Sequence, residues 1–322
     1  MPRIQYRQKK FSDEQLEMIR HVNKIIDRYD ADGYELTLRQ IYYQFVAKDL
    51  FPETRKYVMS GGKWIHSAEG SINAEPNYKW LGDIVSDGRI AGLIDWNAIV
   101  DRTRYVRTHN FWESPQQIID TCARGFRLDP WEDQEHYIEC WIEKDALVGI
   151  IERPCNKHFI PYFSCRGYTS LSEMWQAAQR LSDKVDRGHT VTILHLGDHD
   201  PSGMDMTRDI NDRIREFGHD AEVEVVRLAL NMDQVRQYNP PPNPAKLTDS
   251  RCAEYVLEHG DESWELDALD VSVIEKLIED EIEWRIDDDK LAEVKKKQER
   301  MKDDLKAISR NYDAVVKWLK NV

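Results

Sequence analysis

The stretch from Thr190 to Gly203 reads Thr-Val-Thr-Ile-Leu-His-Leu-Gly-Asp-His-Asp-Pro-Ser-Gly. Its first half is β-branched and apolar, which predicts a buried strand, and its second half is rich in turn formers. Asp198 and Asp200 therefore follow the carboxyl end of a strand, where open α/β sheets bind ligands. A helix is expected from Met204 to about Phe217, with its N-terminal dipole near any bound phosphate. Two such aspartates can hold Mg²⁺, although an ordinary turn with a helix cap uses the same residues.

The composition is that of a globular chain with room for two domains. It has 322 residues, of which 41% are hydrophobic and 32% charged. No apolar run approaches the roughly 20 residues of a membrane span, and the basic N-terminus lacks the apolar core of a signal peptide. Five cysteines without a Cys-x-x-Cys pair favour a reducing compartment and argue against a zinc ribbon. We therefore expect a cytoplasmic protein that contacts no membrane, in a bacterium or, if phage-encoded, in its host.

The net charge of −14 is unevenly distributed. Residues 253–289 contain 15 acidic and 2 basic residues, and so carry −13 of it. Residues 1–66 contain 12 basic and 9 acidic residues, a net charge of +3. A basic N-terminal surface for nucleic acid is therefore compatible with the acidic total. The segment Asp101–Arg107 interleaves three arginines with a tyrosine, which suits phosphate contact but also fits a solvated strand edge.

The N-terminal region is predicted to contain three helices and a strand. Ser12 and Gln15 form a capping box at the start of the first helix. The expected elements are a helix from Phe11 to Asp30, a helix from Thr37, a loop at 52–76, a helix from about Asn77 to Asp87, and a turn into a short strand at 88–94. This order is that of a winged helix, a common DNA-binding unit.

The second of these helices carries a tyrosine pair, Tyr42 and Tyr43. Arg39 lies four residues before Tyr43 and therefore shares its helix face. Because adjacent helical residues face different directions, we expect one tyrosine in the core and the other at a DNA-binding surface. Core packing is the alternative for either ring.

The middle of the chain alternates strands and helices. Strands are expected at Tyr137–Trp141, near Ile160–Ser164 and at Ala221–Leu230, with a helix at Ser170–Asp186. Together with the strand before Asp198, this order predicts an α/β domain with a mostly parallel sheet. Glu143 follows the first strand. Three carboxylates at adjacent strand ends, Glu143, Asp198 and Asp200, form a candidate site for Mg²⁺, with Mn²⁺ as a substitute.

The C-terminal third contains an acidic helix that runs through Ile286 and a final segment with heptad-like spacing. Apolar positions there recur at intervals of three and four, interrupted only by Gln298: Leu291, Val294, Met301, Leu305, Ile308, Tyr312, Val315 and Leu319. A coiled coil with a partner and a long helix packed on its own domain both fit this pattern. We divide the chain into residues 1–110, 111–289 and 290–322.

Four segments, in their order along the chain, resemble the A-type, DNA-cleaving component of DNA topoisomerase VI, whose family includes the meiotic double-strand-break transesterase. They are Thr37–Tyr43, Ile142–Asp145, Arg166–Tyr168 and Gly197–Gly203. The short mini-A relatives of bacteria, phages and other mobile elements are the most similar. The resemblance covers roughly residues 12 to 285, and implies a winged-helix domain followed by a Rossmann-like Toprim domain, here with a long C-terminal helix.

The resemblance also implies an activity, namely cleavage of double-stranded DNA by a tyrosine that stays attached to the 5′ phosphate. By position, Tyr43 would be the nucleophile and Arg39 the arginine one turn before it. Glu143, Asp198 and Asp200 would hold Mg²⁺. The family acts as a homodimer in which the tyrosine of one protomer meets the metal of the other. This chain carries no ATPase module, so strand passage would need a separate B-type subunit.

A tyrosine nucleophile is chemically reasonable only with assistance. A phenol has a pKa of about 10, and a nearby guanidinium or metal would favour the phenolate. Two alternatives stay open: a Toprim nuclease that uses water, with Tyr43 purely structural, and a DNA-binding or recruitment protein that does not cleave. A covalent adduct, free DNA ends and salt-dependent binding to intact DNA would distinguish the three.

Overall fold

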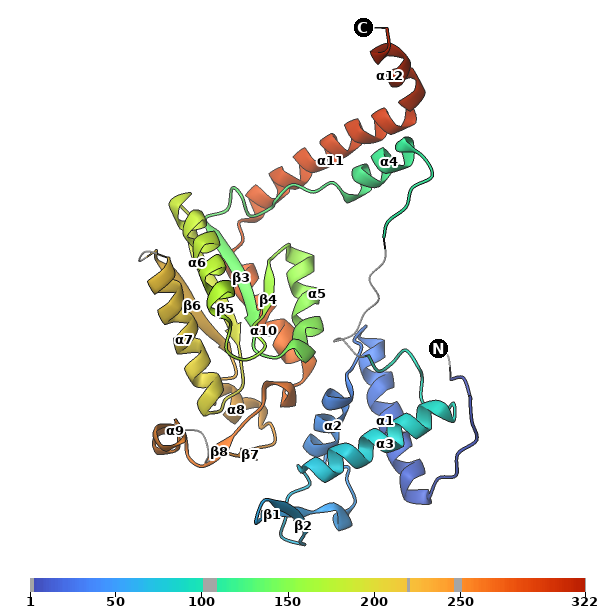
Figure 1. Cartoon of the computed structure of the whole chain (residues 1–322), viewed down its shortest axis with the longest axis vertical. Helices are drawn as coiled ribbons and strands as arrows, with labels where there is room; N and C mark the ends of the chain where they lie inside the picture. The colour runs from blue at the N-terminus through green and yellow to red at the C-terminus, as the bar shows by residue number, and fades with distance from the viewer. Residues whose placement is uncertain (1–2, 101–108, 219–220, 246–250, 322) are drawn as a thin grey trace.

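The computed structural model describes residues 3–100, 109–218, 221–245 and 251–321. Figure 1 shows a helical N-terminal unit, a sheet domain flanked by helices and a helical arm that ends near the C-terminus. The arginine-containing segment Asp101–Arg107 lies outside the described residues. Among the described residues, no helix combines the length and apolar character needed to cross a membrane.

The N-terminal unit consists of three helices and a β-hairpin: α1 (Asp13–Ala31), α2 (Leu38–Ala47), β1 (Tyr57–Ser60), β2 (Lys63–His66) and α3 (Glu75–Ile90), with a 3₁₀ turn at Glu53–Arg55. The predicted capping box of Ser12 and Gln15 at the start of α1 is confirmed. Thr37 caps α2 in the same manner, because its hydroxyl accepts from the backbone N–H of Gln40 and the Gln40 side chain accepts in return.

Two predictions for this unit are wrong. The expected loop at 52–76 contains the antiparallel hairpin β1–β2, which turns at Gly61 and Gly62, both with positive φ. The expected strand at 88–94 is absent, because α3 continues to Ile90 and a turn follows. The order is therefore helix, helix, hairpin, helix, which differs from the predicted helix, helix, helix, strand.

The predicted parallel sheet is confirmed. Its four strands are β3 (His136–Ile142), β4 (Tyr162–Ser164), β5 (Thr190–Leu196) and β6 (Val223–Ala229), arranged in the order β4-β3-β5-β6 and paired in parallel. Ile142 at the end of β3 is in register with Leu196 at the end of β5. The residues that follow these two strands, including Glu143 and Asp198, therefore start side by side at the carboxyl edge of the sheet.

Helices cover both faces of the sheet (Figure 1). On one face lie α5 (Val148–His158), which follows a 3₁₀ turn at Asp145–Leu147, and α10 (Val271–Arg285). On the other lie α6 (Leu171–Asp186) and α7 (Pro201–Phe217). Side chains alternate accordingly along β3, since Ile138, Cys140 and Ile142 join the first core and Tyr137 and Trp141 join the second.

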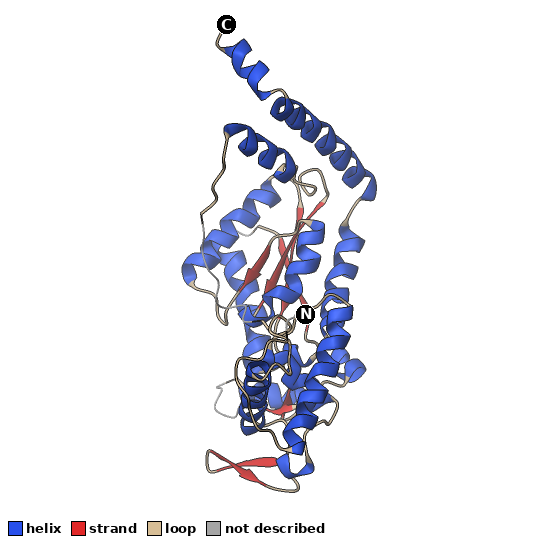
Figure 2. Ribbon diagram, turned by 90° about the vertical axis from the view of Figure 1, so that its right-hand side faces the viewer, coloured by secondary structure: helices blue, strands red, loops and turns tan. Residues whose placement is uncertain are grey.

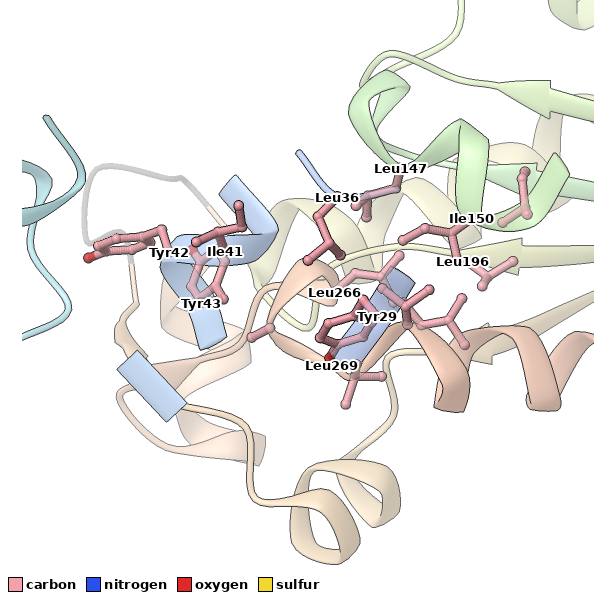
Figure 3. Close-up of a cluster of buried hydrophobic side chains, with 14 of the residues drawn as sticks. Tyr29, Leu36, Ile41, Tyr42, Tyr43, Leu147, Ile150, Leu196, Leu266 and Leu269 are labelled. Carbon is pink, nitrogen blue, oxygen red and sulfur yellow. The ribbon is translucent and has the colours of Figure 1, made fainter. Parts of the chain in front are cut away.

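The N-terminal helices and the first face of the sheet share one apolar core. In Figure 3, Ile41, Tyr42 and Tyr43 from α2 belong to the same buried cluster as Leu147, Ile150 and Leu196 from the sheet domain. The remaining elements lie beyond β6: α8 (Met232–Tyr238), β7 (Asn243–Pro244), α9 (Cys252–His259), β8 (Glu262–Ser263) and a 3₁₀ turn, η3 (Leu266–Ala268). Because η3 contacts α2, this connection brings the acidic segment back to the tyrosine-bearing helix.

The arm consists of α4 (Pro115–Gly125), α11 (Asp288–Arg310) and α12 (Tyr312–Leu319). Figure 2 shows α11 and α12 extending past the sheet domain. The final segment is thus two helices, which corrects the prediction of one long helix. The first, α11, ends at Arg310, and the backbone N–H of its C-cap residue Asn311 closes the last turn.

A buried carboxylate joins α6 to the sheet. Glu139 on β3 is fully buried and accepts hydrogen bonds from Tyr137 Oη and Trp141 Nε1, both at 3.0 Å. Arg180 on α6 donates to it with Nε at 2.8 Å and Nη2 at 2.9 Å. This two-pronged pairing neutralises the only charge that β3 buries among the described residues.

Removing Arg180 should destabilise the sheet domain. The Arg180→Met variant leaves the Glu139 carboxylate buried without its counter-charge, which should lower the free energy of unfolding by about 3 kcal/mol. Arg208→Met on α7, which breaks exposed pairs with Asp205 and Asp212, is the matched control and should cost under about 1 kcal/mol. Urea denaturation measures both values, and equal losses would contradict the role given to Glu139.

Candidate functional site

The carboxyl edge of the sheet brings two of the predicted acidic residues into contact. The backbone N–H of Asp198 donates to Glu143 Oε2 at 3.0 Å. Asp198 itself is buried, and its Oδ1 accepts from the backbone N–H of Leu266 at 2.8 Å. The prediction from sequence that these two acids meet at adjacent strand ends is therefore confirmed.

The turn after β5 is held by a helix cap and a partly buried arginine. Asp200 is the N-cap of α7, where its Oδ1 accepts from the backbone N–H of Gly203 at 2.7 Å. Arg227 on β6 donates to the carbonyl oxygens of Asp198 at 2.5 Å and of Gly203 at 2.9 Å. Gly203 packs so closely that a Cβ there would overlap the carbonyl oxygen of Asp198. The Asp-x-Asp turn therefore needs a glycine at this position.

Burial and mutual repulsion disfavour ionisation of these acids. Burial raises the pKa of Asp198 to about 7, and the neighbouring Glu143 contributes in the same direction. Burial also raises the pKa of Glu143, with Asp200 adding to the effect. Burial lowers the pKa of the Arg227 guanidinium to about 10, although the three carboxylates oppose that shift. Nearby cations would therefore stabilise the ionised forms of these acids, and in this structure protein side chains supply those cations.

Lys144 supplies much of this positive charge. Its Nζ lies 2.8 Å from Asp198 Oδ2, 2.9 Å from Glu265 Oε2 and 3.1 Å from Asp267 Oδ1. Burial alone would favour the neutral amine, but the carboxylates, Asp267 foremost, raise the pKa of Lys144 above its ordinary value. Three carboxylates thus converge on one ammonium group directly after β3.

Arg39 on α2 enters the same network from the N-terminal unit. It pairs with Glu265, and its Nε lies 2.5 Å from Asp267 Oδ2. Its guanidinium carbon lies 5.7 Å from the centre of the Tyr43 ring, which confirms that Arg39 and Tyr43 share a helix face. We call these five residues, Arg39, Lys144, Asp198, Glu265 and Asp267, the ion network.

Both tyrosines of the pair are buried, each only 4% exposed, so the expectation that one of them reaches the surface is wrong (Figure 3). The Tyr42 hydroxyl donates to Asn73 Oδ1 at 3.0 Å and accepts from the backbone N–H of Ala74 at 2.8 Å. Burial raises the pKa of Tyr43, Asp267 and Glu265 raise it further, and Arg39 and Lys144 oppose them. In this arrangement Tyr43 is a protonated core residue.

The three predicted metal ligands do not form a cation cage as arranged. In the part of the chain that the structure describes, no group of three or more His, Cys, Asp or Glu side chains is placed to hold a metal ion. Asp198 is paired with Lys144, and Asp200 caps a helix. His195 and His199 are likewise engaged in separate contacts, since His195 Nδ1 lies 2.9 Å from Thr207 Oγ1 and His199 Nδ1 lies 2.7 Å from Tyr255 Oη.

Sequence reasoning missed three members of the ion network. In the sequence, Lys144 stands out only as part of the segment Ile142–Asp145, and Glu265 and Asp267 only as charges of an acidic segment. The one available signal is the alternation in Trp264-Glu-Leu-Asp-Ala-Leu, which sets acids beside apolar residues that must be buried. That pattern indicates a partly buried segment, but it does not identify the cations that pair with the acids of this segment.

Comparisons of the chain with protein-family models, with curated proteins and with solved structures found no match. A functional assignment therefore depends on the residues and contacts described above.

Adding a methyl group at Gly203 should disrupt the turn. Because the Cβ of Gly203→Ala would overlap the Asp198 carbonyl, the turn must shift, at a cost of about 2 kcal/mol in unfolding free energy. Gly125→Ala at the end of α4 has open space around its Cβ and should change stability by less than about 0.5 kcal/mol. Chemical denaturation compares the two variants, and equal effects would show that the close approach does not constrain the turn.

The raised pKa of Asp198 predicts a pH dependence of stability. Between about pH 4 and pH 7 the folded protein keeps a proton on Asp198 that the unfolded chain releases, so stability falls as the pH rises through this window. Relative to Asp198→Asn, the wild type should lose on the order of 4 kcal/mol from pH 4 to pH 8. Asp233→Asn on α8, at an exposed position, is the control. A difference between wild type and Asp198→Asn that does not change with pH would contradict the assignment.

Proposed function

We propose that the protein is a DNA-cleaving transesterase of the topoisomerase VI A-subunit kind. In this proposal, the N-terminal unit, with the β1–β2 hairpin, acts as a winged-helix-like DNA-binding domain, and the sheet domain acts as a Toprim domain. The observation that carries the proposal is the ion network, since one chain of contacts connects the Tyr43–Arg39 face of α2 with the carboxylates at the sheet edge.

The reaction assigned to Tyr43 is a transesterification. The phenol oxygen attacks a backbone phosphorus, the phenol loses its proton, and the 3′ oxygen of the neighbouring nucleotide leaves as a hydroxyl. The new phosphotyrosine bond conserves the energy of the phosphodiester, so the break can be resealed without a cofactor. Because Tyr43 is buried here, cleavage requires that Arg39 separate from Glu265 and Asp267 and that α2 move away from η3.

The cofactor and partners follow from the same proposal. A divalent cation, Mg²⁺ or Mn²⁺, would be held by Glu143, Asp198 and Asp200 once Asp198 is freed from Lys144, and would supply charge stabilisation. Double-stranded DNA is the substrate, and two copies of the chain would act together. A separate B-type ATPase subunit would be needed for strand passage.

One observation favours a second candidate, a metal-dependent nuclease that uses water. Tyr43 is buried and its pKa is raised, which is the state expected of a structural tyrosine. In that case the carboxylates at the sheet edge would serve cleavage, and α2 would only pack against η3.

Replacing the tyrosine hydroxyl separates these candidates. Purified protein is incubated with supercoiled plasmid and Mg²⁺ or Mn²⁺, stopped with detergent and analysed with and without protease. We expect protein-linked nicked or linear DNA from the wild type, at least a 100-fold loss in Tyr43→Phe, and retention in Tyr42→Phe.

Tyr42→Phe is a matched control, because it removes a hydroxyl with its own hydrogen bonds from the neighbouring position. Cleavage that persists in Tyr43→Phe with free DNA ends would favour the nuclease. Salt-dependent DNA binding without cleavage would overturn both enzymatic candidates and leave a DNA-binding protein.

A further inference from the structure

A pocket lies at the amino edge of the sheet, between the segment that precedes β3, the end of α5 and the end of α6. It has a volume of about 360 Å³ and is lined by three aromatic side chains, Trp131, Tyr137 and Phe159, together with the cations Arg127 and Lys184. A pocket of this size suits a small molecule, because interfaces with folded partners are several times larger.

The pocket is remote from the residues assigned to cleavage. Tyr137 is the second residue of β3, whereas Glu143 follows the last residue of that strand. At roughly 3.3 Å per residue, the pocket and the carboxyl edge of the sheet are about 20 Å apart. A ligand of this pocket is therefore distinct from a phosphate held at the Asp-x-Asp turn.

Two of the aromatic rings offer apolar faces to the pocket, because their polar atoms are already bonded elsewhere. Trp131 Nε1 donates to the carbonyl oxygen of His158 at 2.7 Å, and Tyr137 Oη donates to Glu139 at 3.0 Å. Two prolines complete this apolar floor. The floor therefore suits a planar, largely apolar group.

Phe159 is held in a backbone conformation that phenylalanine rarely adopts. It follows the last residue of α5 with φ 56° and ψ 40°, in the left-handed region. Helices that end in this way usually place Gly or Asn there, as α8 does with Asn239. Burial compensates only in part for the strain, because Phe159 is 45% exposed. An aromatic ring kept at a strained position beside a pocket indicates a role in binding.

The first cation, Arg127, has capacity for an anionic ligand. Its side chain is exposed, and its guanidinium carbon lies 5.5 Å from the centre of the Phe159 ring. Its Nη1 donates to the carbonyl oxygen of Gly125 at 3.3 Å, and no acid within the described ranges pairs with it. An anion beside Phe159 would therefore supply the counter-charge that Arg127 lacks.

The second cation, Lys184, is loosely paired although its side chain is only 14% exposed. Its Nζ lies 3.4 Å from Glu132 Oε2 and 4.0 Å from Asp129 Oδ2, longer than the roughly 2.8 Å of a strong charged hydrogen bond. Glu132 also lies 3.5 Å from Arg187, so Lys184 can turn to a ligand without leaving that acid unpaired. Among the described residues that line the pocket, Asp129 is the one acid, and with Arg127 and Lys184 it gives the lining a net charge of +1.

We infer that this pocket binds a small aromatic anion. In this arrangement a planar ring packs against Phe159 and the apolar floor, while a phosphate or carboxylate group is held by Arg127 and Lys184. Nucleoside monophosphates and aromatic carboxylic acids share this chemistry. The inference does not rest on the proposed function, because the pocket contains none of the residues assigned to cleavage.

Calorimetric titration of the full-length protein tests the inference. The compounds are adenosine monophosphate and phenylacetate, with their neutral counterparts adenosine and phenylacetamide. We expect at least one anion to bind with a dissociation constant below about 1 mM, and its neutral counterpart to bind at least about tenfold more weakly. Binding of one anion alone would assign the ligand to its class, and binding of both would support the shared chemistry. Binding of neither, or equal binding of anion and neutral counterpart, would overturn the inference.

Removing either cation should weaken binding of the anion at least about tenfold, because a charged contact to the ligand is lost. Arg127→Met and Lys184→Met keep a long side chain but remove its charge. Arg124→Met, which breaks an exposed pair with Asp120 on α4 outside the pocket, is the matched control and should bind as the wild type does. Unchanged affinity in either cation variant would place the ligand elsewhere and contradict the inference.

Replacing the strained ring distinguishes binding from packing. Because Asn tolerates the left-handed region, Phe159→Asn should unfold at the same urea concentration as the wild type or a higher one, yet bind the anion at least about tenfold more weakly. Phe159→Tyr keeps the ring and should bind within about threefold of the wild type. Unchanged affinity in Phe159→Asn would overturn the inference, and a lower urea midpoint would contradict the strain from which the role of Phe159 is argued.

DNA cleavage provides an independent readout. A protein that binds the anion but cleaves no DNA would leave this inference intact and contradict only the proposed function. Cleavage by a protein that binds neither anion would do the reverse.

Discussion

The structure depends on the placement of five charges in the ion network between α2 and the sheet edge. Two cations, Arg39 and Lys144, face three carboxylates that belong to two separate segments, Asp198 after β5 and Glu265 with Asp267 around η3. Removing any one of them leaves a buried charge with too few partners, which is more costly than replacing the whole set by apolar groups. The network is therefore weak support for stability as such, but it restricts how the N-terminal unit can sit on the sheet domain.

Other contacts between the two units are consistent with that restriction. Tyr29 and Arg28 on α1 both reach Asp270, the N-cap of α10, and Arg153 on α5 donates to the backbone carbonyl oxygen of Asp32, just after α1, at 3.1 Å. Together, these polar contacts surround the apolar core that the two units share. Rotation of α2 to expose Tyr43 would thus disturb charges and apolar packing together, so we expect the opened state to need DNA, a divalent cation or a second copy to stabilise it.

The parts of the fold that could be predicted from the sequence are those determined by neighbouring residues. The capping box at Ser12, the helix start at Thr37, the buried strand before Asp198 and the alternation of strands and helices all depend on residues close together in the chain. The hairpin was missed although Gly61-Gly62 between apolar residues is a turn signal, because the surrounding segment is polar enough to look like a loop. Glu265 and Asp267 could not be placed, because more than 220 residues separate them from Arg39 and their segment is acidic throughout.

The acidic segment therefore has two physical roles that its composition conceals. Asp267 is fully buried and Glu265 is partly buried, and both are neutralised by cations, whereas Glu283 and Asp288 lie at the surface without burial. A count of charges treats these residues alike. They differ because of where they lie. Glu265 and Asp267 are at η3, which packs against α2, whereas Glu283 and Asp288 are at the end of α10 and the start of α11, where the arm begins. Net charge thus argues against a nucleic-acid partner only when the charges are exposed, and part of the −13 in residues 253–289 is already balanced inside the protein.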